Sequence, residues 1–261
     1  PQTWRQFATT FLAATGLPNR MFGYFLAQVL LGAGRVEPER MQAYAEKAMR
    51  EACDGTSWVA PDSDYESAVQ AAVGAAYTDP GLRVAWDELD RLLQAPGWSN
   101  ALGQKLVQLT MPGVPDVYQG TELWEDSLVD PDNRRAVDFA LRRALLAADR
   151  PPAVDATGAA KLWLTSRALR ARRDRPEAFT SYAPLTAVGP AADHLVGFDR
   201  GAACTLATRL PVRLTAAGGW GDTHLTLPYA GTDVLSGRPL SGTVALAEVF
   251  DRYPVALVLA D

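Results

Sequence analysis

The spacing of hydrophobic residues changes along the chain, and this change constrains the fold more than any other feature of the sequence. In the first hundred residues apolar positions recur every three or four residues, as on one face of a helix; Met41, Ala45 and Met49 do so within residues 38–53. From about Tyr182 onward, short apolar runs are instead punctuated by glycine and proline. The sequence therefore predicts a mixed α and β fold.

Residues that begin and end helices divide the first part of the chain. Ser63 and Glu66 have the spacing of a capping box, which predicts a helix that begins there and runs to Tyr77. Asp79 followed by proline predicts another helix, which ends by Pro96. We expect the first hundred residues to be helical.

The C-terminal part carries strand candidates at a spacing of roughly 8–12 residues, which is typical of an all-β sandwich. We therefore expect an antiparallel β-sandwich over residues 181–261. The expected strands are 195–198, 203–208, 212–215, 223–227, 232–235, 243–246 and 255–259.

Between these parts, residues 99–180 resemble a piece of an α/β fold. A short apolar stretch at 114–118 has no polar alternation, and it follows a helix expected over 102–109, so it is typical of a buried parallel strand. Further helices are expected over 137–148 and 157–173. One strand with its helices is too little to close an α/β domain. Either the fold is unusual or the chain lacks its other half.

Charge and rare residues argue against several classes of protein. The net charge is −5, from 25 basic and 30 acidic residues, whereas nucleic-acid binding needs a basic face. Cys53 and Cys204 lie far apart, and His194 and His224 are too few for a histidine metal site. No apolar run approaches the ~20 residues of a membrane span, and residues 1–11 lack the features of a signal peptide. We expect a soluble cytoplasmic protein that binds no nucleic acid and no membrane.

Two adjacent motifs carry a resemblance to a known enzyme family. The eighth barrel strand of the α-amylase superfamily reads Pro-Gly-x-Pro-x-x-Tyr-x-Gly-x-Glu, and residues 109–124 resemble it: Leu-Thr-Met-Pro-Gly-Val-Pro-Asp-Val-Tyr-Gln-Gly-Thr-Glu-Leu-Trp. Residues 127–138 resemble the maltooligosyltrehalose synthase family of glycoside hydrolases: Ser-Leu-Val-Asp-Pro-Asp-Asn-Arg-Arg-Ala-Val-Asp. Ala136 departs from the family pattern, which usually has proline there, and this loosens the loop slightly. Similarity to a helical insertion of the family extends over 44–52, 56–61 and 65–66.

The resemblance implies the C-terminal part of such an enzyme. The implied domains are an α-helical subdomain over 1–98, the last strand and helices of a (β/α)8 barrel over 99–180, and the C-terminal sandwich over 181–261. The implied reaction is an intramolecular transglucosylation by a glucosylmutase, an isomerase of trehalose biosynthesis. It converts the reducing-end α-1,4 link of a maltooligosaccharide into an α,α-1,1 link, and it needs no cofactor and no metal. The family's catalytic carboxylates lie on earlier barrel strands, so we assign no catalytic residue here and expect the upstream barrel portion as partner.

Three residues after the expected strand at 114–118 are candidates for substrate binding, because a barrel places its active site at the C-terminal ends of its strands. Tyr118 offers an aromatic face to a pyranose ring, and Gln119 and Glu122 offer polar groups to its hydroxyls. The alternative is that Tyr118 packs in the top of the barrel and Glu122 caps or pairs locally.

A charged loop follows, and it supplies five further candidates. A carboxylate and a guanidinium close together can lock a loop and still present donors to sugar hydroxyls. The favoured pair is Asp132 with Arg135 or Arg134. The alternative is a solvated cluster that only forms a turn. The loop's candidates are Asp130, Asp132, Asn133, Arg134 and Arg135.

Two other functions are compatible with these residues. Another glucan hydrolase or transferase of the α-amylase superfamily would share the barrel-strand motif, but it would release glucose or reducing ends. A non-catalytic carbohydrate-binding or packing module would bind maltodextrins or nothing, without turnover. The loop over residues 128–135 favours the synthase over both.

Overall fold

The computed structural model describes residues 2–128, 132–148 and 150–261. The chain divides into two compact units, each assembled from two stretches of sequence. The helical unit comprises Pro1–Gln94 and Asp126–Ala136, and the sheet unit comprises Ala95–Glu125 and Val137–Asp261. Among the described residues, no helix has the length and apolar character needed to cross a membrane.

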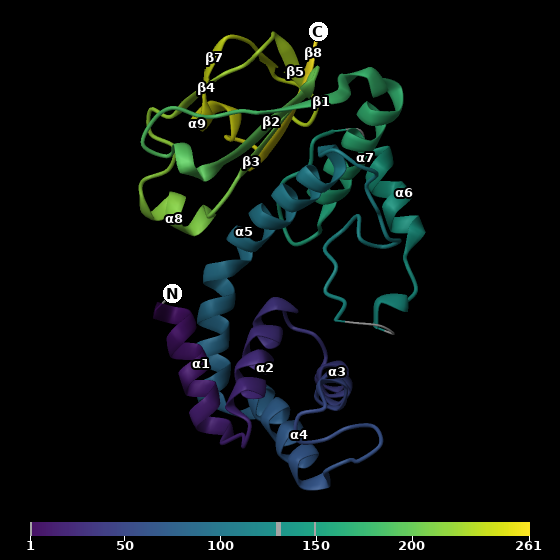
Figure 1. Ribbon diagram of the computed structural model, residues 1–261, viewed down its shortest axis with the longest axis vertical. Helices are drawn as coiled ribbons and strands as arrows, with labels where there is room; N and C mark the ends of the chain where they lie inside the picture. The colour runs from purple at the N-terminus through teal and green to yellow at the C-terminus, as the bar shows by residue number, and fades with distance from the viewer. Residues whose placement is uncertain (1, 129–131, 149) are drawn as a thin grey trace. The chain divides into compact units, whose positions relative to one another are not determined.

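Helices pack around a single core in the helical unit (Figure 1). They are α1 (Gln2–Thr15), α2 (Arg20–Gly32), α3 (Pro38–Ala52), α4 (Ser63–Thr78) and the first part of α5 (Pro80–Thr110). Phe11, Leu26 and Trp86 are fully buried in this core. Met41 and Met49 of α3 are buried beside them, which confirms the helix predicted from their spacing.

Side-chain caps determine where α2 and α4 begin. Asn19 accepts hydrogen bonds from two backbone N–H groups in the first turn of α2, and Asp62 does the same for α4. The predicted capping box is therefore wrong. The cap is Asp62, Ser63 is the first helical residue, and the carboxylate of Glu66 binds Arg50 instead.

The predicted end of a helix at Pro96 is also wrong, because α5 continues to Thr110. Proline inside a helix removes a hydrogen bond and disfavours the helix locally. Beyond it, Leu102, Leu106 and Leu109 are fully buried in the core of the sheet unit. Burial of this stripe stabilises the second half of α5 despite the proline.

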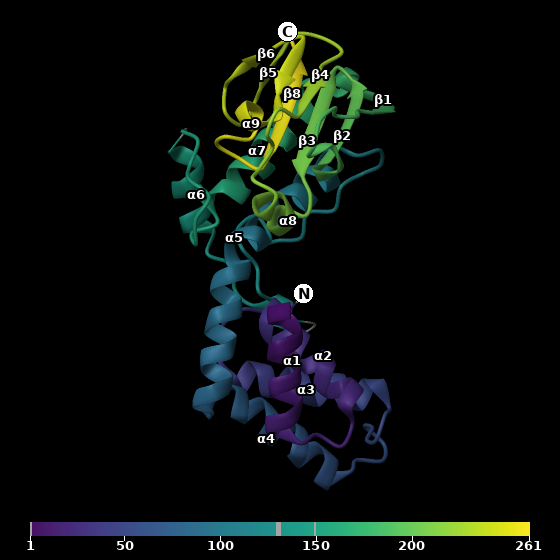
Figure 2. The same ribbon diagram turned by 90° about the vertical axis from the view of Figure 1, so that its left-hand side faces the viewer.

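The sheet unit contains an antiparallel sheet with strand order β1-β2-β3-β8-β5-β6 and a second sheet formed by β4 and β7 (Figures 1 and 2). The strands are β1 (Phe179–Pro184), β2 (Leu195–Gly201), β3 (Ala203–Thr208), β4 (His224–Thr226), β5 (Gly231–Asp233), β6 (Pro239–Leu240), β7 (Thr243–Ala245) and β8 (Val255–Ala260). The helices are α6 (Phe139–Ala147), α7 (Ala159–Asp174), α8 (Pro211–Ala216) and α9 (Leu246–Val249). The predicted mixed α and β fold with an antiparallel sheet is confirmed.

The larger sheet is covered on both faces, so every residue of β3 is buried. Ala207 packs on one face in the same core as Leu106 of α5 and Leu164 of α7. Leu206 points to the other face and packs in the same core as Trp220. Figure 2 shows α7 behind the larger sheet.

Two of the predicted strands are wrong. Residues 212–215 lie in α8, because Pro211 occupies the first turn of that helix. Residues 114–118 form no strand, and Val114 is 96% exposed. A parallel strand needs hydrogen-bonding neighbours, and the described strand pairs are all antiparallel and none includes this segment. Strands β1 and β6 have no counterpart among the predicted ones, and the domain limits, the barrel and the sandwich stay predictions.

Candidate functional site

Tyr118, Gln119 and Glu122 lie in an irregular segment of the sheet unit, residues 111–124, which we call the Tyr118 segment. The segment turns after Tyr118, whose carbonyl accepts hydrogen bonds from the backbone N–H and the hydroxyl of Thr121 at 3.2 and 2.7 Å. Gly120 has a φ of +92°, which glycine adopts without strain. This turn leaves the side chains of Tyr118 and Gln119 exposed.

Arg142 of α6 donates three hydrogen bonds, two of them to this turn and one to the start of its own helix. Its Nε donates to Glu122 Oε2 at 3.1 Å, its Nη2 to the Gly120 carbonyl at 2.7 Å and its Nη1 to the Asp138 carbonyl at 3.1 Å. The side chains of Arg142 and Glu122 are only 14% and 22% exposed. Glu122 is thus an ion-pair partner within the protein, and its contact with sugar stays a prediction.

Two more arginines bind the backbone that leads into the turn. Arg172 of α7 donates to three carbonyls between residues 109 and 113, at 2.9 to 3.3 Å. Arg200 of β2 is nearly buried and donates to three carbonyls, including that of Thr110 at 2.6 Å. Burial lowers the pKa of the Arg200 guanidinium. These contacts fix a proline- and glycine-rich stretch that forms no sheet ladder.

Asp132 lies in the helical unit, where Arg40 of α3 binds it. The Nε and Nη2 atoms of Arg40 donate to the two carboxylate oxygens at 3.0 and 2.8 Å, and Nη2 also donates to the Asp126 carbonyl at 3.2 Å. The backbone N–H of Leu128 donates to the same carboxylate at 2.9 Å. The hydrogen bonds from Arg40, more than any other contact, lower the pKa of Asp132. The Asp132 carboxylate therefore stabilises its loop through hydrogen bonds within the protein.

Arg135 contacts its own loop and also reaches solvent. Its Nε donates to the Asp132 carbonyl at 3.1 Å, and its Nη2 donates to the Ser127 hydroxyl at 3.0 Å. The side chain is 48% exposed. The predicted pair of Asp132 and Arg135 is present as an ion pair with 3.8 Å between Nε and Oδ1.

The structure divides the predicted residues between the two units. Residues 118–122 belong to the sheet unit, and residues 132–135 belong to the helical unit. Asn133 and Arg134 lie in a short 3-10 helix, and Asp130 lies outside the described residues. Whether any of them contacts sugar stays a prediction.

Sequence reasoning missed Arg40 and Arg142, the two residues that bind the predicted carboxylates. Arg40 is 92 residues from Asp132 in sequence, and Arg142 is 20 residues from Glu122. No motif contains either arginine together with its acid. Only the fold brings these charges together.

A further arginine of α3 forms a half-buried charged cluster in the helical unit. Arg50 donates to both carboxylate oxygens of Glu66, at 2.9 and 2.7 Å, and to Glu46 at 2.5 Å. The Thr56 hydroxyl donates to Glu66 at 2.7 Å. Arg50 and Thr56 together lower the pKa of Glu66 to about 2.

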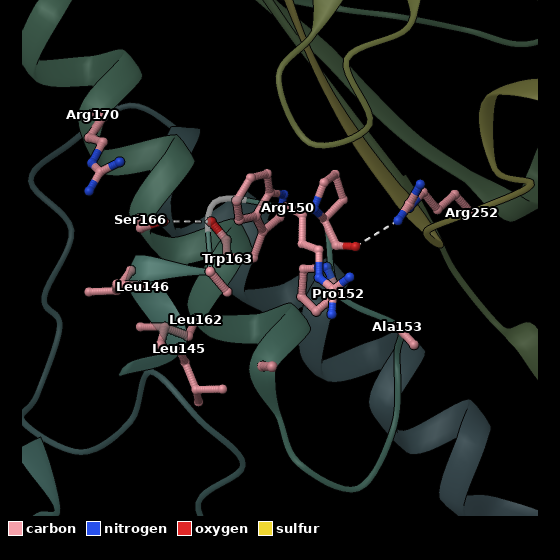
Figure 3. Close-up of a pocket in the computed structure, with 13 residues that line it drawn as sticks. Leu145, Leu146, Arg150, Pro152, Ala153, Leu162, Trp163, Ser166, Arg170 and Arg252 are labelled. Atoms are coloured by element: carbon pink, nitrogen blue, oxygen red, sulfur yellow. Dashed lines mark hydrogen bonds between the residues drawn. The ribbon is translucent and has the colours of Figure 1, made fainter. Parts of the chain in front are cut away.

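A cavity described in the sheet unit lies outside the set of predicted residues. A cavity of about 480 Å³ in the sheet unit is lined by α6 and α7 residues such as Leu146, Trp163 and Arg170 (Figure 3). None of the predicted residues is among those described as lining it. Among the described residues, no three acidic, cysteine or histidine side chains are placed to hold a metal ion.

Comparison with known proteins first gives the fold. A segment of the solved structure of the DSM5389 glycosyltrehalose synthase has the same fold: it superposes with a TM-score of 0.83 at 24% identity, over 99% of this chain and 34% of that one. No family model matches the chain.

The particular homologues are maltooligosyltrehalose synthases. The solved structure of the enzyme from Arthrobacter ramosus is 48% identical and superposes with a TM-score of 0.96, over 100% of this chain and 35% of that chain. A protein of Mycobacterium tuberculosis with the provisional name maltooligosyl trehalose synthase is 42% identical over 100% of this chain and 34% of its own length. The chain thus spans about a third of the length of the relatives it matches.

Proposed function

We propose that this chain is the C-terminal part of a maltooligosyltrehalose synthase, which converts the reducing-end α-1,4 link of a maltooligosaccharide into an α,α-1,1 link. The observation that carries the proposal is the 48% identity and TM-score of 0.96 along the whole chain with the Arthrobacter ramosus enzyme. The alignment covers the whole chain and therefore includes both units, so the likeness does not rest on one shared motif alone.

In the proposed reaction the α-1,4 bond to the reducing-end glucose breaks, the remaining glucan is held covalently through its terminal glucosyl unit, and it is then transferred to the 1-hydroxyl of the released glucose. Water competes with the glucose 1-hydroxyl for this intermediate, so transfer requires that water be excluded. The proposed role of this chain is to bind the glucan and help to enclose it. Tyr118 and Gln119 are suited to this role because they are exposed on a backbone that is held in place, and the half-exposed side chain of Arg135 carries a group that is chemically suited to sugar hydroxyls.

The proposal extends to the parts of the fold. Residues 1–98 are the helical insertion, residues 99–180 complete the (β/α)8 barrel, and residues 181–261 form the sandwich. Residues 114–118 become the eighth strand when the upstream part of the enzyme supplies neighbours, which explains an apolar segment that is exposed here. We place the whole enzyme in the cytoplasm.

A chimeric enzyme tests the function. The segment of the Arthrobacter ramosus synthase that this chain matches is replaced by the 261 residues of this chain, and the product is incubated with maltopentaose. Reducing ends and free glucose are followed in parallel. We expect reducing ends to disappear with little glucose released, while the 261-residue chain alone shows no turnover.

Each rival function gives a different result. Release of glucose or of new reducing ends by the chimera would favour a hydrolase or another transferase. A folded chimera without any turnover would favour a binding or packing module. Loss of reducing ends with the 261-residue chain alone would show that it contains its own catalytic residues.

A further inference from the structure

Arg142 of α6 lies outside the motifs of the sequence and makes contacts with the turn after Tyr118. The guanidinium joins three acceptors: the Glu122 carboxylate, the Gly120 carbonyl and the Asp138 carbonyl. The first two belong to the turn that follows Tyr118. The third belongs to the N-cap residue of α6, whose side chain accepts a hydrogen bond from the Leu141 N–H at 2.9 Å. Arg142 thus ties the turn to the start of a helix.

This ion pair differs from an ordinary surface pair in its burial and in the number of its hydrogen bonds. The side chains of Arg142 and Glu122 are 14% and 22% exposed, whereas those of the surface pair Arg173 and Asp174 are 71% and 56% exposed. Charge-assisted hydrogen bonds are the strong ones, and burial protects them from screening by salt. The geometry of a planar guanidinium also fixes the directions of its bonds.

Other side chains hold the two flanks of the turn: Gln108 Nε2 donates to the Asp116 carbonyl at 2.7 Å, and Lys161 Nζ donates to the Leu123 carbonyl at 3.0 Å. The Tyr118 segment contains no helix and no strand between residues 111 and 124. Gly120 leaves little room, because a Cβ added there would lie 3.2 Å from Val137 Cγ2 and 3.8 Å from Arg142 Nη2. The position of the exposed Tyr118 and Gln119 side chains therefore depends on contacts made by residues 120–122, and Arg142 makes two of those contacts.

We propose that Arg142 is a positioning residue: through Gly120 and Glu122 it holds the turn that presents Tyr118 and Gln119 to the glucan. In this arrangement Glu122 acts as an anchor within the protein, and the side chains that meet the sugar are Tyr118 and Gln119. The inference rests on the proposed function for its ligand, a maltooligosaccharide, and on the structure for its geometry.

The chimera with the Arthrobacter ramosus enzyme provides the first test. In Arg142→Met we expect KM for maltopentaose to rise about tenfold, because the free energy of one lost charge-assisted hydrogen bond corresponds to about that change in affinity. We also expect the ratio of free glucose to trehalosyl product to rise. Arg142→Lys keeps the charge but not the fork of donors, and it should restore KM only in part. Arg143→Met is the matched control, because Arg143 is an exposed neighbour on the same helix.

KM and the product ratio separate positioning from stability. Both are properties of the folded molecules, so a merely structural role would reduce yield and melting temperature and leave them unchanged. Unchanged KM and product ratio in Arg142→Met, or an equal effect of Arg143→Met on them, would overturn the proposal. Arg142→Lys keeps the test valid if the methionine variant does not fold.

Amide hydrogen exchange on the 261-residue chain provides a second test that needs no activity. Peptides covering residues 111–124 should exchange faster in Arg142→Met than in the parent chain and in Arg143→Met, while peptides of β3 should not change. Unchanged exchange in residues 111–124 would overturn the positioning role. An inactive parent chimera would count against the proposed function, and the exchange experiment would still decide the role of Arg142.

Discussion

At the scale of single residues, arginine side chains replace regular hydrogen bonding where the backbone leaves helix and strand. Arg142 and Arg172 bind carbonyls of the Tyr118 segment, and Arg40 binds the Asp126 carbonyl in the helical unit. One guanidinium carries five donors and stays charged under all ordinary conditions. A single residue can therefore satisfy several carbonyls at once, which lysine cannot do in the same geometry.

The aromatic side chain of Tyr118 gives a prediction about binding. Tyr118 is 46% exposed, so its removal should cost little stability. In the chimera, Tyr118→Ala should raise KM for maltopentaose about tenfold or more, because stacking of a ring on a sugar is lost along with its apolar contact area. Steady-state kinetics measures the effect. Tyr182→Ala is the control, since Tyr182 is 57% exposed in β1; equal KM values for the two variants would contradict the binding role.

The Glu66 cluster gives a prediction about pH. Its hydrogen bonds to Arg50 and Thr56 lower the pKa of Glu66 from 4.5 to about 2 in the folded chain. The carboxylate therefore stabilises the fold fully above pH 4.5, and this stabilisation is lost as the pH falls toward 2. Glu66→Gln should lower the urea midpoint of unfolding near neutral pH and should flatten its decline in acid. Parallel curves for parent and variant at all pH values would refute this assignment.

At the scale of elements, the sequence predicts what depends on local spacing and misses what depends on distant partners. The helix at α3 and the strand at β3 carry their own hydrophobic pattern, and both are present. Residues 212–215 look like a strand, but Pro211 and the packing of Leu214 make them helical. Residues 114–118 have the composition of a strand without a ladder to join. The candidate acids were visible in the sequence, and the arginines that hold them were not.

The junction between α7 and the Tyr118 segment gives a prediction about stability. Gly158 is the N-cap of α7 with a φ of +72°, and a Cβ there would lie 2.7 Å from the backbone nitrogen of Trp124 and 3.2 Å from its ring. Gly158→Ala should therefore destabilise the chain by about 1–3 kcal/mol, through backbone strain and displacement of Trp124. Thermal unfolding measures the loss. Gly237→Ala, where φ is +77° but a Cβ meets nothing within 4 Å, reports the backbone strain alone; equal losses in the two variants would contradict the contact with Trp124.

At the scale of the whole molecule, neither unit is a continuous stretch of sequence. The chain leaves the helical unit after Gln94, returns at Asp126 and leaves again after Ala136. The loop that carries Asp132 is therefore bound by Arg40 to helices that precede it by many residues. The predicted limits at residues 98 and 180 rest on composition, whereas these two units are defined by contacts between residues, so the limits stay predictions.

The apolar surface of the sheet unit gives the last prediction, which concerns association. Helix α6 has no buried residue, and Phe139 and Leu146 are 52% and 39% exposed. These two side chains lie seven residues apart and so share one face of the helix. An exposed apolar face of this kind favours association.

In the proposed full-length synthase this face of α6 would be covered, so the 261-residue chain alone should self-associate in light scattering. Phe139→Glu with Leu146→Glu should shift it toward the monomer, whereas Val59→Glu, at a single 95% exposed residue of the helical unit, should not. A monomeric parent chain would show that this face needs no partner. Equal effects of the double substitution in α6 and of Val59→Glu would show that association does not occur through α6.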